Sequence, residues 1–90
     1  MRLRWTVPAS QDLYSITRYI RRDNPTAARE VAEAIYEGCE NLVNSPHRGR
    51  KGKHSGTREL VFSPLPYVAV YRVMEDVVEI LHIWHGAQDR

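Results

Sequence analysis

The segment from Arg58 to Gln88 restricts the possible folds of this chain more than any other. Val, Ile, Tyr and Phe dominate three short runs in it, at residues 58–62, 67–73 and 77–84, and these residue types pack well on a pleated sheet. The short links between the runs leave no room for the crossover of about a dozen residues that a parallel pair needs. The segment therefore predicts a three-stranded antiparallel meander.

The residues before this segment predict a cover for one side of the sheet. Residues 67–73 are apolar on both faces, which places their strand inside a sheet that another layer must cover. Residues 3–6 alternate in polarity and predict an N-terminal edge strand, and Pro8 suits the first position of a following helix. That helix carries an apolar stripe at helical spacing and basic residues near its end, namely Ala9, Leu13, Ile16 and Ile20, then Arg18, Arg21 and Arg22.

Asn24 and Pro25 predict the N-cap and the first residue of a second helix, which we expect to run to about residue 44. Its apolar face consists of Val31, Ala34, Ile35, Gly38 and Leu42. The tight link makes the two helices an antiparallel hairpin. We therefore expect an α+β fold of order β-α-α-β-β-β, in which the hairpin packs on one face of a mainly antiparallel four-stranded sheet.

An acidic row on the second helix is open to two interpretations. Its members share one helix face because they are spaced by three or four residues: Glu30, Glu33, Glu37 and Glu40. The row is either a solvated surface or a face that meets a basic partner.

Length and composition exclude several classes of protein. Ninety residues predict one domain, residues 1–90, and the 42% hydrophobic content is that of an ordinary globular protein. No apolar run approaches the roughly 20 residues of a membrane span, and the N-terminus lacks the apolar core of a signal peptide. A single cysteine, Cys39, cannot form an internal disulfide, which agrees with a cytoplasmic location.

A basic, glycine-rich loop between the second helix and the meander is the first candidate for function. Residues 47–58 contain no acid and five cations, Arg48, Arg50, Lys51, Lys53 and Arg58, so this segment carries +5 and the rest of the chain −3. Clustered Lys and Arg bind nucleic acid by neutralising phosphates. The loop is therefore a candidate for target binding, through phosphate or an acidic peptide, and is otherwise a mobile, solubilising loop.

Histidine and arginine on the predicted strands are the second candidates. His85 ends the last strand and could act as a general acid or base, or could simply be hydrogen-bonded there. Arg72 points away from the helices if these cover the side of Tyr67 and Tyr71. Arginines on that open face could bind phosphate or stabilise a phosphoryl transition state, and they could equally bind a carboxylate of a protein partner or only border the sheet. His82 falls on the opposite strand face from His85. We expect neither a metal site nor a cofactor.

Short motifs follow one another along the chain in a recognisable order. They are Asp12-Leu13 with Ile16 and Tyr19-Ile20, Asn24-Pro25 with Ala27-Ala28, Leu42 with Ser45-Pro46 and Gly49-Arg50, Gly56-Thr57-Arg58-Glu59-Leu60, Pro66-Tyr67 with Tyr71-Arg72-Val73, and Ile80-Leu81 leading to His85-Gly86-Ala87-Gln88. Their order resembles that of the RelE/ParE superfamily of bacterial toxin–antitoxin toxins, over nearly the whole chain.

The resemblance implies one of two activities and a cognate antitoxin as partner. RelE-like members cut mRNA in the ribosomal A site with basic and acid–base side chains, and Arg58, Arg72 and His85 are the candidates for that chemistry here. ParE-like members inhibit DNA gyrase and have no known catalytic set, so such a toxin would not be an enzyme. The antitoxins of this superfamily wrap the toxin with a helix and an extended segment.

Two departures from the ribonuclease pattern favour the ParE-like activity. Val68 follows Tyr67, where the ribonucleases commonly carry an arginine, and the sequence ends at Arg90 without the tyrosine-bearing tail of RelE. We therefore expect a gyrase inhibitor, with a ribosome-dependent mRNA endonuclease as the first alternative. A non-toxic nucleic-acid-binding module that uses the same basic loop is the second.

Overall fold

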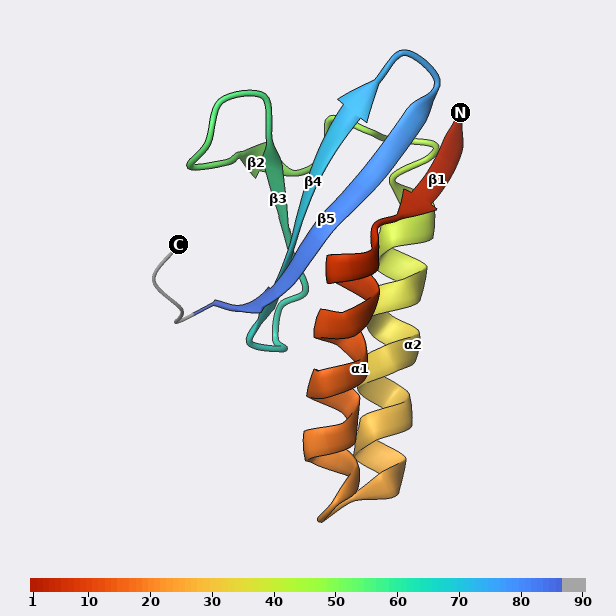
Figure 1. Ribbon diagram of the computed structural model, residues 1–90, viewed down its shortest axis with the longest axis vertical. Coiled ribbons are helices and arrows are strands. Elements are labelled where there is room, and N and C mark those ends of the chain that lie inside the picture. The colour runs from red at the N-terminus through yellow and green to blue at the C-terminus, as the bar shows by residue number, and fades with distance from the viewer. Residues whose placement is uncertain (87–90) are drawn as a thin grey trace.

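The computed structural model describes residues 1–86 (Figure 1). In chain order the elements are β1 (Arg2–Trp5), α1 (Val7–Arg21), α2 (Pro25–Asn41), β2 (Arg50–Lys51), β3 (Arg58–Val61), β4 (Tyr67–Met74) and β5 (Val77–His85). The predicted α+β fold, with an edge strand, a helix hairpin and a meander, is confirmed. Ala87 and Gln88, the last motif residues of the resemblance, lie outside the described residues.

The sheet has five strands in the order β1-β5-β4-β3-β2, so the prediction of four strands was one short. β1 pairs with β5 in parallel, and all other neighbours are antiparallel. The missing strand, β2, pairs Arg50 with Glu59 and Lys51 with Arg58. Two residues are too few to show a period of alternation, so only the pairing itself reveals this strand.

Each of the two helices begins directly after a residue whose side chain caps its N-terminus. The Asn24 side chain accepts a hydrogen bond from Ala27 N at 3.0 Å, as predicted for an N-cap. Thr6 caps α1 in the same way and its hydroxyl also donates to Ile80 O at 2.8 Å, which fastens the start of α1 to β5. No helix among residues 1–86 is long and apolar enough to cross a membrane.

The second helix ends three residues earlier than predicted, at Asn41. After it, Leu42, Val43 and Asn44 donate to carbonyls three residues before them, so the chain continues in tighter turns rather than in α-helix. Leu42 nevertheless stays fully buried, which explains why the apolar pattern extends past the helix.

The core lies between the helix hairpin and one face of the sheet, while the turn between the helices projects beyond the sheet (Figure 1). It is built from Ala9, Leu13, Val31, Ile35, Cys39, Leu42, Leu60, Ala69, Tyr71, Val78, Ile80 and Ile83. Gly38 allows α2 to approach β3, because a Cβ at this position would lie 2.5 Å from a ring carbon of Phe62. The predicted stripes therefore face the sheet, with Cys39 as an unpredicted member.

Within residues 1–86, no helix covers the opposite side of the sheet, which we call the open face (Figure 1). Arg72 lies on it, as predicted, together with Val68 and Val70 of the same strand. The register shifts in β5, where Val70 pairs with His82 but Tyr71 pairs with Ile80. This bulge is the irregularity that places both Ile80 and Ile83 in the core although they are three residues apart.

Candidate functional site

The basic loop is held to the sheet by a buried tyrosine. The Tyr71 hydroxyl donates to Pro46 O at 2.8 Å and accepts from Gly49 N at 2.8 Å. Burial raises the pKa of this hydroxyl, so the group stays protonated and can donate. Gly49 is required beside it, because a Cβ there would lie 2.7 Å from the tyrosine oxygen. The loop is thus anchored at its start rather than mobile along its whole length.

Arg58 holds the same segment from the neighbouring strand. Its Nη1 donates to Gly49 O at 2.8 Å and to His47 O at 3.3 Å. Arg58 pairs with Tyr71 in the sheet, and side chains of directly opposed residues share a face, so this arginine lies on the side of the helices and not on the open face. Its first role in the structure is to position the loop backbone.

The other four cations of the loop point to different places. Arg50 forms an ion pair with Glu59 on the open face at 3.0 Å. Arg48 lies beside Leu60 and Val61 of β3, with residues of α2 nearby. Lys51 lines a hollow on the side of the helices, and Lys53 is exposed near the tip of the loop. The five predicted target-binding residues therefore surround the β2–β3 end of the molecule without forming one patch.

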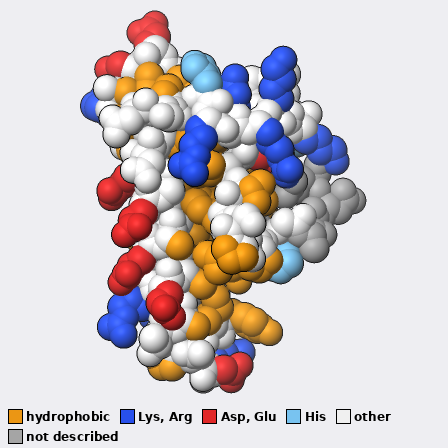
Figure 2. All heavy atoms as spheres, turned by 180° about the vertical axis from the view of Figure 1, so that it is seen from behind, with side chains coloured by type: hydrophobic (Ala, Val, Ile, Leu, Met, Phe, Trp, Pro, Cys, Tyr) orange, Lys and Arg blue, Asp and Glu red, His pale blue; other side chains and the backbone are white. Residues whose placement is uncertain are grey.

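Charge is separated along the molecule (Figure 2). The four glutamates of the acidic row are all exposed and form a column down one flank, whereas Lys and Arg gather at one end of the other flank. The exposed row agrees with the interpretation as a solvated surface. It leaves the alternative of a basic partner open.

A buried carboxylate organises the open face. Glu79 is 6% exposed, and its two oxygens accept from Arg72 Nε at 2.6 Å and from Arg4 Nε at 2.9 Å. The hydrogen bond from Arg72 is the main cause that lowers the pKa of Glu79, supported by Arg4 and opposed by burial. Arg72 is therefore a fixed cation, half exposed and tied to its own counter-charge.

The three candidates for ribonuclease chemistry lie apart. Arg58 is on β3 at the loop end of the covered side, and Arg72 is on the open face. His85 pairs with Tyr67 at the other end of β4, where the two rings meet edge to face at 5.7 Å. The structure brings no two of them into contact.

Sequence reasoning missed a histidine–aspartate pair. Asp12 of α1 lies 3.0 Å from His82 Nδ1 and accepts from Ile83 N at 3.0 Å. β1 pairs only with residues 77–80, so beyond them the edge of β5 is open and Asp12 satisfies it. Because 70 residues separate the partners, no spacing in the sequence could have indicated this pair. His82 also stacks on Trp84 at 4.6 Å.

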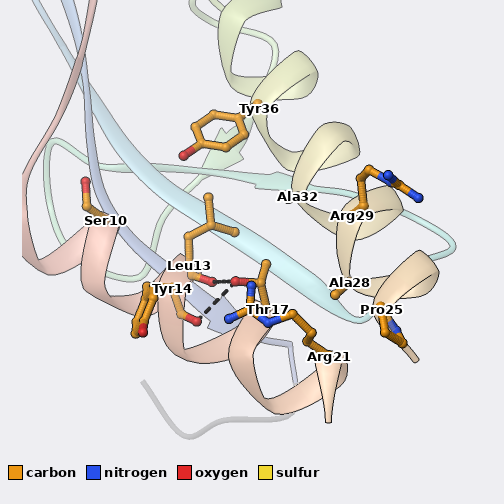
Figure 3. Close-up of a pocket in the computed structure, with 10 residues that line it drawn as sticks. All are labelled: Ser10, Leu13, Tyr14, Thr17, Arg21, Pro25, Ala28, Arg29, Ala32 and Tyr36. Carbon is orange, nitrogen blue, oxygen red and sulfur yellow. Dashed lines mark hydrogen bonds between the residues drawn. The ribbon is translucent and has the colours of Figure 1, made fainter. Parts of the chain in front are cut away.

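A groove lies between α1 and α2 on the helical side (Figure 3). Its volume is about 570 Å³, and its floor consists largely of small or apolar side chains, including Leu13, Ala28 and Ala32. Tyr14 and Tyr36, 59% and 48% exposed, rise at its rim, and Arg21 and Arg29 lie toward the turn between the helices. We call this feature the interhelix groove.

Two observations concern metal ligands and the single cysteine. Within residues 1–86 no group of three or more His, Cys, Asp and Glu is placed to hold a metal ion. Burial, followed by the charge of Glu40, raises the pKa of Cys39 to about 12, so this thiol stays protonated and unreactive at neutral pH.

The family model and the relatives that this chain matches are all toxins. Residues 3–90 match the family model of the ParE toxin of the type II toxin–antitoxin system parDE. The putative toxin Y4kP of Sinorhizobium fredii is 41% identical, and the match covers 97% of this chain and 90% of that protein. Toxin RelE2 of Caulobacter vibrioides is 38% identical, over 93% of both.

Solved structures agree with these matches. A chain of the chromosomal ParDE toxin–antitoxin system from P. aeruginosa is similar with a TM-score of 0.83 and 30% identity, over 92% of each chain. A copper-bound mutant toxin from Helicobacter pylori shares the fold, with a TM-score of 0.65 at 17% identity, over 97% of this chain and 96% of that one.

Proposed function

The chain belongs to the ParE toxin family of type II toxin–antitoxin systems, and we propose that it arrests growth by inhibiting DNA gyrase in the cytoplasm. A toxin of such a system has a cognate antitoxin as its partner. Inhibition of gyrase would require a binding surface for a macromolecule but no catalytic residues.

The separation of Arg58, Arg72 and His85 is the observation on which this proposal depends. Cleavage of RNA by attack of its 2′-hydroxyl needs a base, an acid and charge stabilisation around one phosphate. Here one arginine is bonded to loop carbonyls and another to Glu79, on opposite sides of the sheet. This arrangement supports a toxin that binds its target rather than one that cuts RNA with these three residues.

The proposal is tested with purified protein and two targets. Incubation with gyrase and plasmid should produce gyrase-linked DNA breaks, whereas incubation with translating ribosomes should leave mRNA intact. Glu33→Gln, a change in the exposed acidic row, serves as a folded control that should poison gyrase as the unaltered toxin does. Cuts of A-site mRNA that disappear in Arg72→Ala or His85→Ala would overturn the proposal, and growth unaffected by expression would favour the non-toxic binding module.

A ribosome-dependent mRNA endonuclease is the second candidate, because the open face carries a different acid–base pair. His82, held by Asp12, lies on the same face as Arg72 of the neighbouring strand. An imidazole oriented by a carboxylate is a plausible general base. If mRNA is cut, His82→Asn should abolish the cuts, while Asp76→Asn, a change in the exposed turn before β5, should preserve them. Equal activity of both variants would exclude His82 as the base.

We assign the interhelix groove to the cognate antitoxin. An amphipathic helix of the antitoxin could place the apolar side chains of one face on the apolar floor of the groove. Acidic residues at one end of that helix would then meet Arg21 and Arg29. Ala32→Trp should fill the groove and weaken neutralisation, whereas Ala34→Trp, on another side of α2, should do so less. Neutralisation unchanged by Ala32→Trp would place the antitoxin elsewhere.

A further inference from the structure

A second hollow, of about 400 Å³, opens at the end of the sheet that the helices leave uncovered. It is lined by His47, Lys51, Gly52, His54, Ser55, Gly56, Thr57, Arg58 and Val73. No helix residue and no acidic residue is among them. We call this feature the hairpin hollow.

The walls of the hairpin hollow are held in place by hydrogen bonds. Gly52 N donates to Thr57 O at 2.8 Å, and Thr57 N donates to His54 O at 3.2 Å, which closes the turn between β2 and β3. Gly56 has a φ of +80°, a conformation that favours glycine. Gly52 lets the two sides meet, because a Cβ there would lie 2.3 Å from Thr57 Oγ1. Arg58 fixes the third wall through His47 O and Gly49 O.

Several donors on these walls have no partner of their own. The Lys51 ammonium, the imidazoles of His47 and His54, and the Ser55 hydroxyl make no hydrogen bond or ion pair within residues 1–86. Arg50 and Arg72, by contrast, are each matched to a carboxylate. The hairpin hollow is thus a place in the described structure where positive charge converges without an acid among the lining residues.

We propose that the hairpin hollow binds a phosphate group of a nucleic-acid backbone. A phosphate has several oxygens that point in different directions, which suits donors of different kinds arranged around a small hollow. A carboxylate is planar and is matched best by the parallel donors of one arginine. Arg58 already uses Nη1 for two carbonyls, and the other donors here are an ammonium, two imidazoles and a hydroxyl, none of which presents a parallel pair of N–H groups. These features favour phosphate over an acidic peptide.

The inference goes beyond gyrase inhibition, because it concerns a binding site of the isolated toxin. Toxicity without phosphate binding would refute only the inference. Phosphate binding by a protein that leaves gyrase unaffected would refute only the proposed function.

The test is a titration of isotope-labelled toxin followed by amide chemical shifts. Inorganic phosphate and the dinucleotide dTpdT are the two probes, and a glutamate-rich peptide is the competitor. Saturable shifts should be confined to the amides of the residues that line the hollow and of their immediate neighbours in the chain. Lys51→Gln should weaken binding by about tenfold, the effect of one charge-assisted hydrogen bond. Lys53→Gln removes the same charge from the same loop outside the hollow and should weaken binding by less than about twofold.

Each other outcome counts against the inference. Equal weakening by Lys51→Gln and Lys53→Gln would indicate diffuse attraction to the loop rather than a site. Stronger binding of the acidic peptide than of dTpdT would make the hollow a carboxylate site. If inorganic phosphate binds but dTpdT does not, the nucleic-acid backbone is excluded as the ligand. If neither probe causes saturable shifts, the hollow is not a phosphate site.

Discussion

The two faces of the sheet bury their side chains in different ways. On the covered face Tyr71 and Ile80 are inaccessible because helices lie over them. On the open face Val70 and Glu79 are only 5% and 6% exposed, although no helix within residues 1–86 covers them. Arg4, Arg50 and Arg72 form ion pairs with the buried carboxylates of this face. We infer that their apolar stems shield the side chains beneath them.

The comparison teaches that burial has different consequences on the two faces. Removal of apolar area from water stabilises the covered face directly. A buried ion pair contributes little net stability, because desolvation offsets the attraction, yet it is costly to break. The covered face should therefore set how stable the protein is, and the open face should set where its arginines are held.

The largest effect is expected from a cavity under the helices. Ile35 is fully buried, so Ile35→Ala should lower the free energy of unfolding by about 2–5 kcal/mol. Val61 lies on the open face and is 45% exposed, so Val61→Ala should change the free energy of unfolding by no more than about 0.5 kcal/mol. Urea unfolding followed by circular dichroism measures both. Similar losses for the two variants would contradict the distinction between the faces.

The next effect is expected from the carboxylate that joins β1, β4 and β5. Glu79→Gln keeps the shape of the side chain but leaves Arg4 and Arg72 without a counter-charge, which should cost about 1.5–3 kcal/mol. Asp76→Asn breaks the exposed pair with Arg2, 3.9 Å long, and should cost less than about 1 kcal/mol. Equal unfolding free energies for the two variants would mean that burial does not strengthen the Glu79 network.

The same network predicts how stability depends on pH. The pKa of Glu79 is lowered by folding, so its contribution is complete above its ordinary value of 4.5 and is lost as the pH falls through the lower folded value. The stability difference between the unaltered protein and Glu79→Gln should be constant between neutral pH and about 5 and should shrink in more acidic solution. A difference that grows in acid would contradict this assignment.

A smaller and more local effect is expected where the covered face holds the basic loop. Tyr71→Phe leaves Gly49 N and Pro46 O without their shared partner and should cost about 1–2 kcal/mol. Hydrogen exchange should accelerate at Gly49 more than in α1. Tyr19→Phe, at a residue that is 72% exposed, is the matched control and should change neither quantity. Unchanged exchange at Gly49 would show that Arg58 alone holds the loop.

The smallest effect is expected at the edge of the open face. Arg50→Met retains an apolar stem over the sheet but loses the ion pair with Glu59, and because the arginine side chain is 60% exposed the cost should be about 0.5–1 kcal/mol. Thermal unfolding of Arg50→Met and of Arg50→Ala separates the contribution of the apolar stem to stability from that of the charge, because Arg50→Ala loses both. If both variants lose the same stability, the stem does not shield this face.

Most of the fold could be predicted because it depends on patterns between residues that are close in the sequence. Asn24 and Pro25 start α2 as expected, and the apolar runs became β3, β4 and β5 with ends shifted by at most one residue. The position of Arg72 on the open face also followed from simple alternation. The candidate site was less predictable. Arg58 was predicted to bind the target because it belongs to the basic segment, but its guanidinium donates to a carbonyl of the loop itself.

By itself, then, the sequence determined the helix hairpin, the meander and the side of the sheet that the helices cover, because caps, turns and apolar periods act between residues close in the chain. Only the tertiary structure decided which charges remain available. Pairing of β2 with β3, the contact of Asp12 with His82 and the anchoring of the loop by Tyr71 join residues 7 to 70 positions apart. Whether a charged side chain meets an opposite charge, a carbonyl or an empty hollow depends on distances that only folding sets.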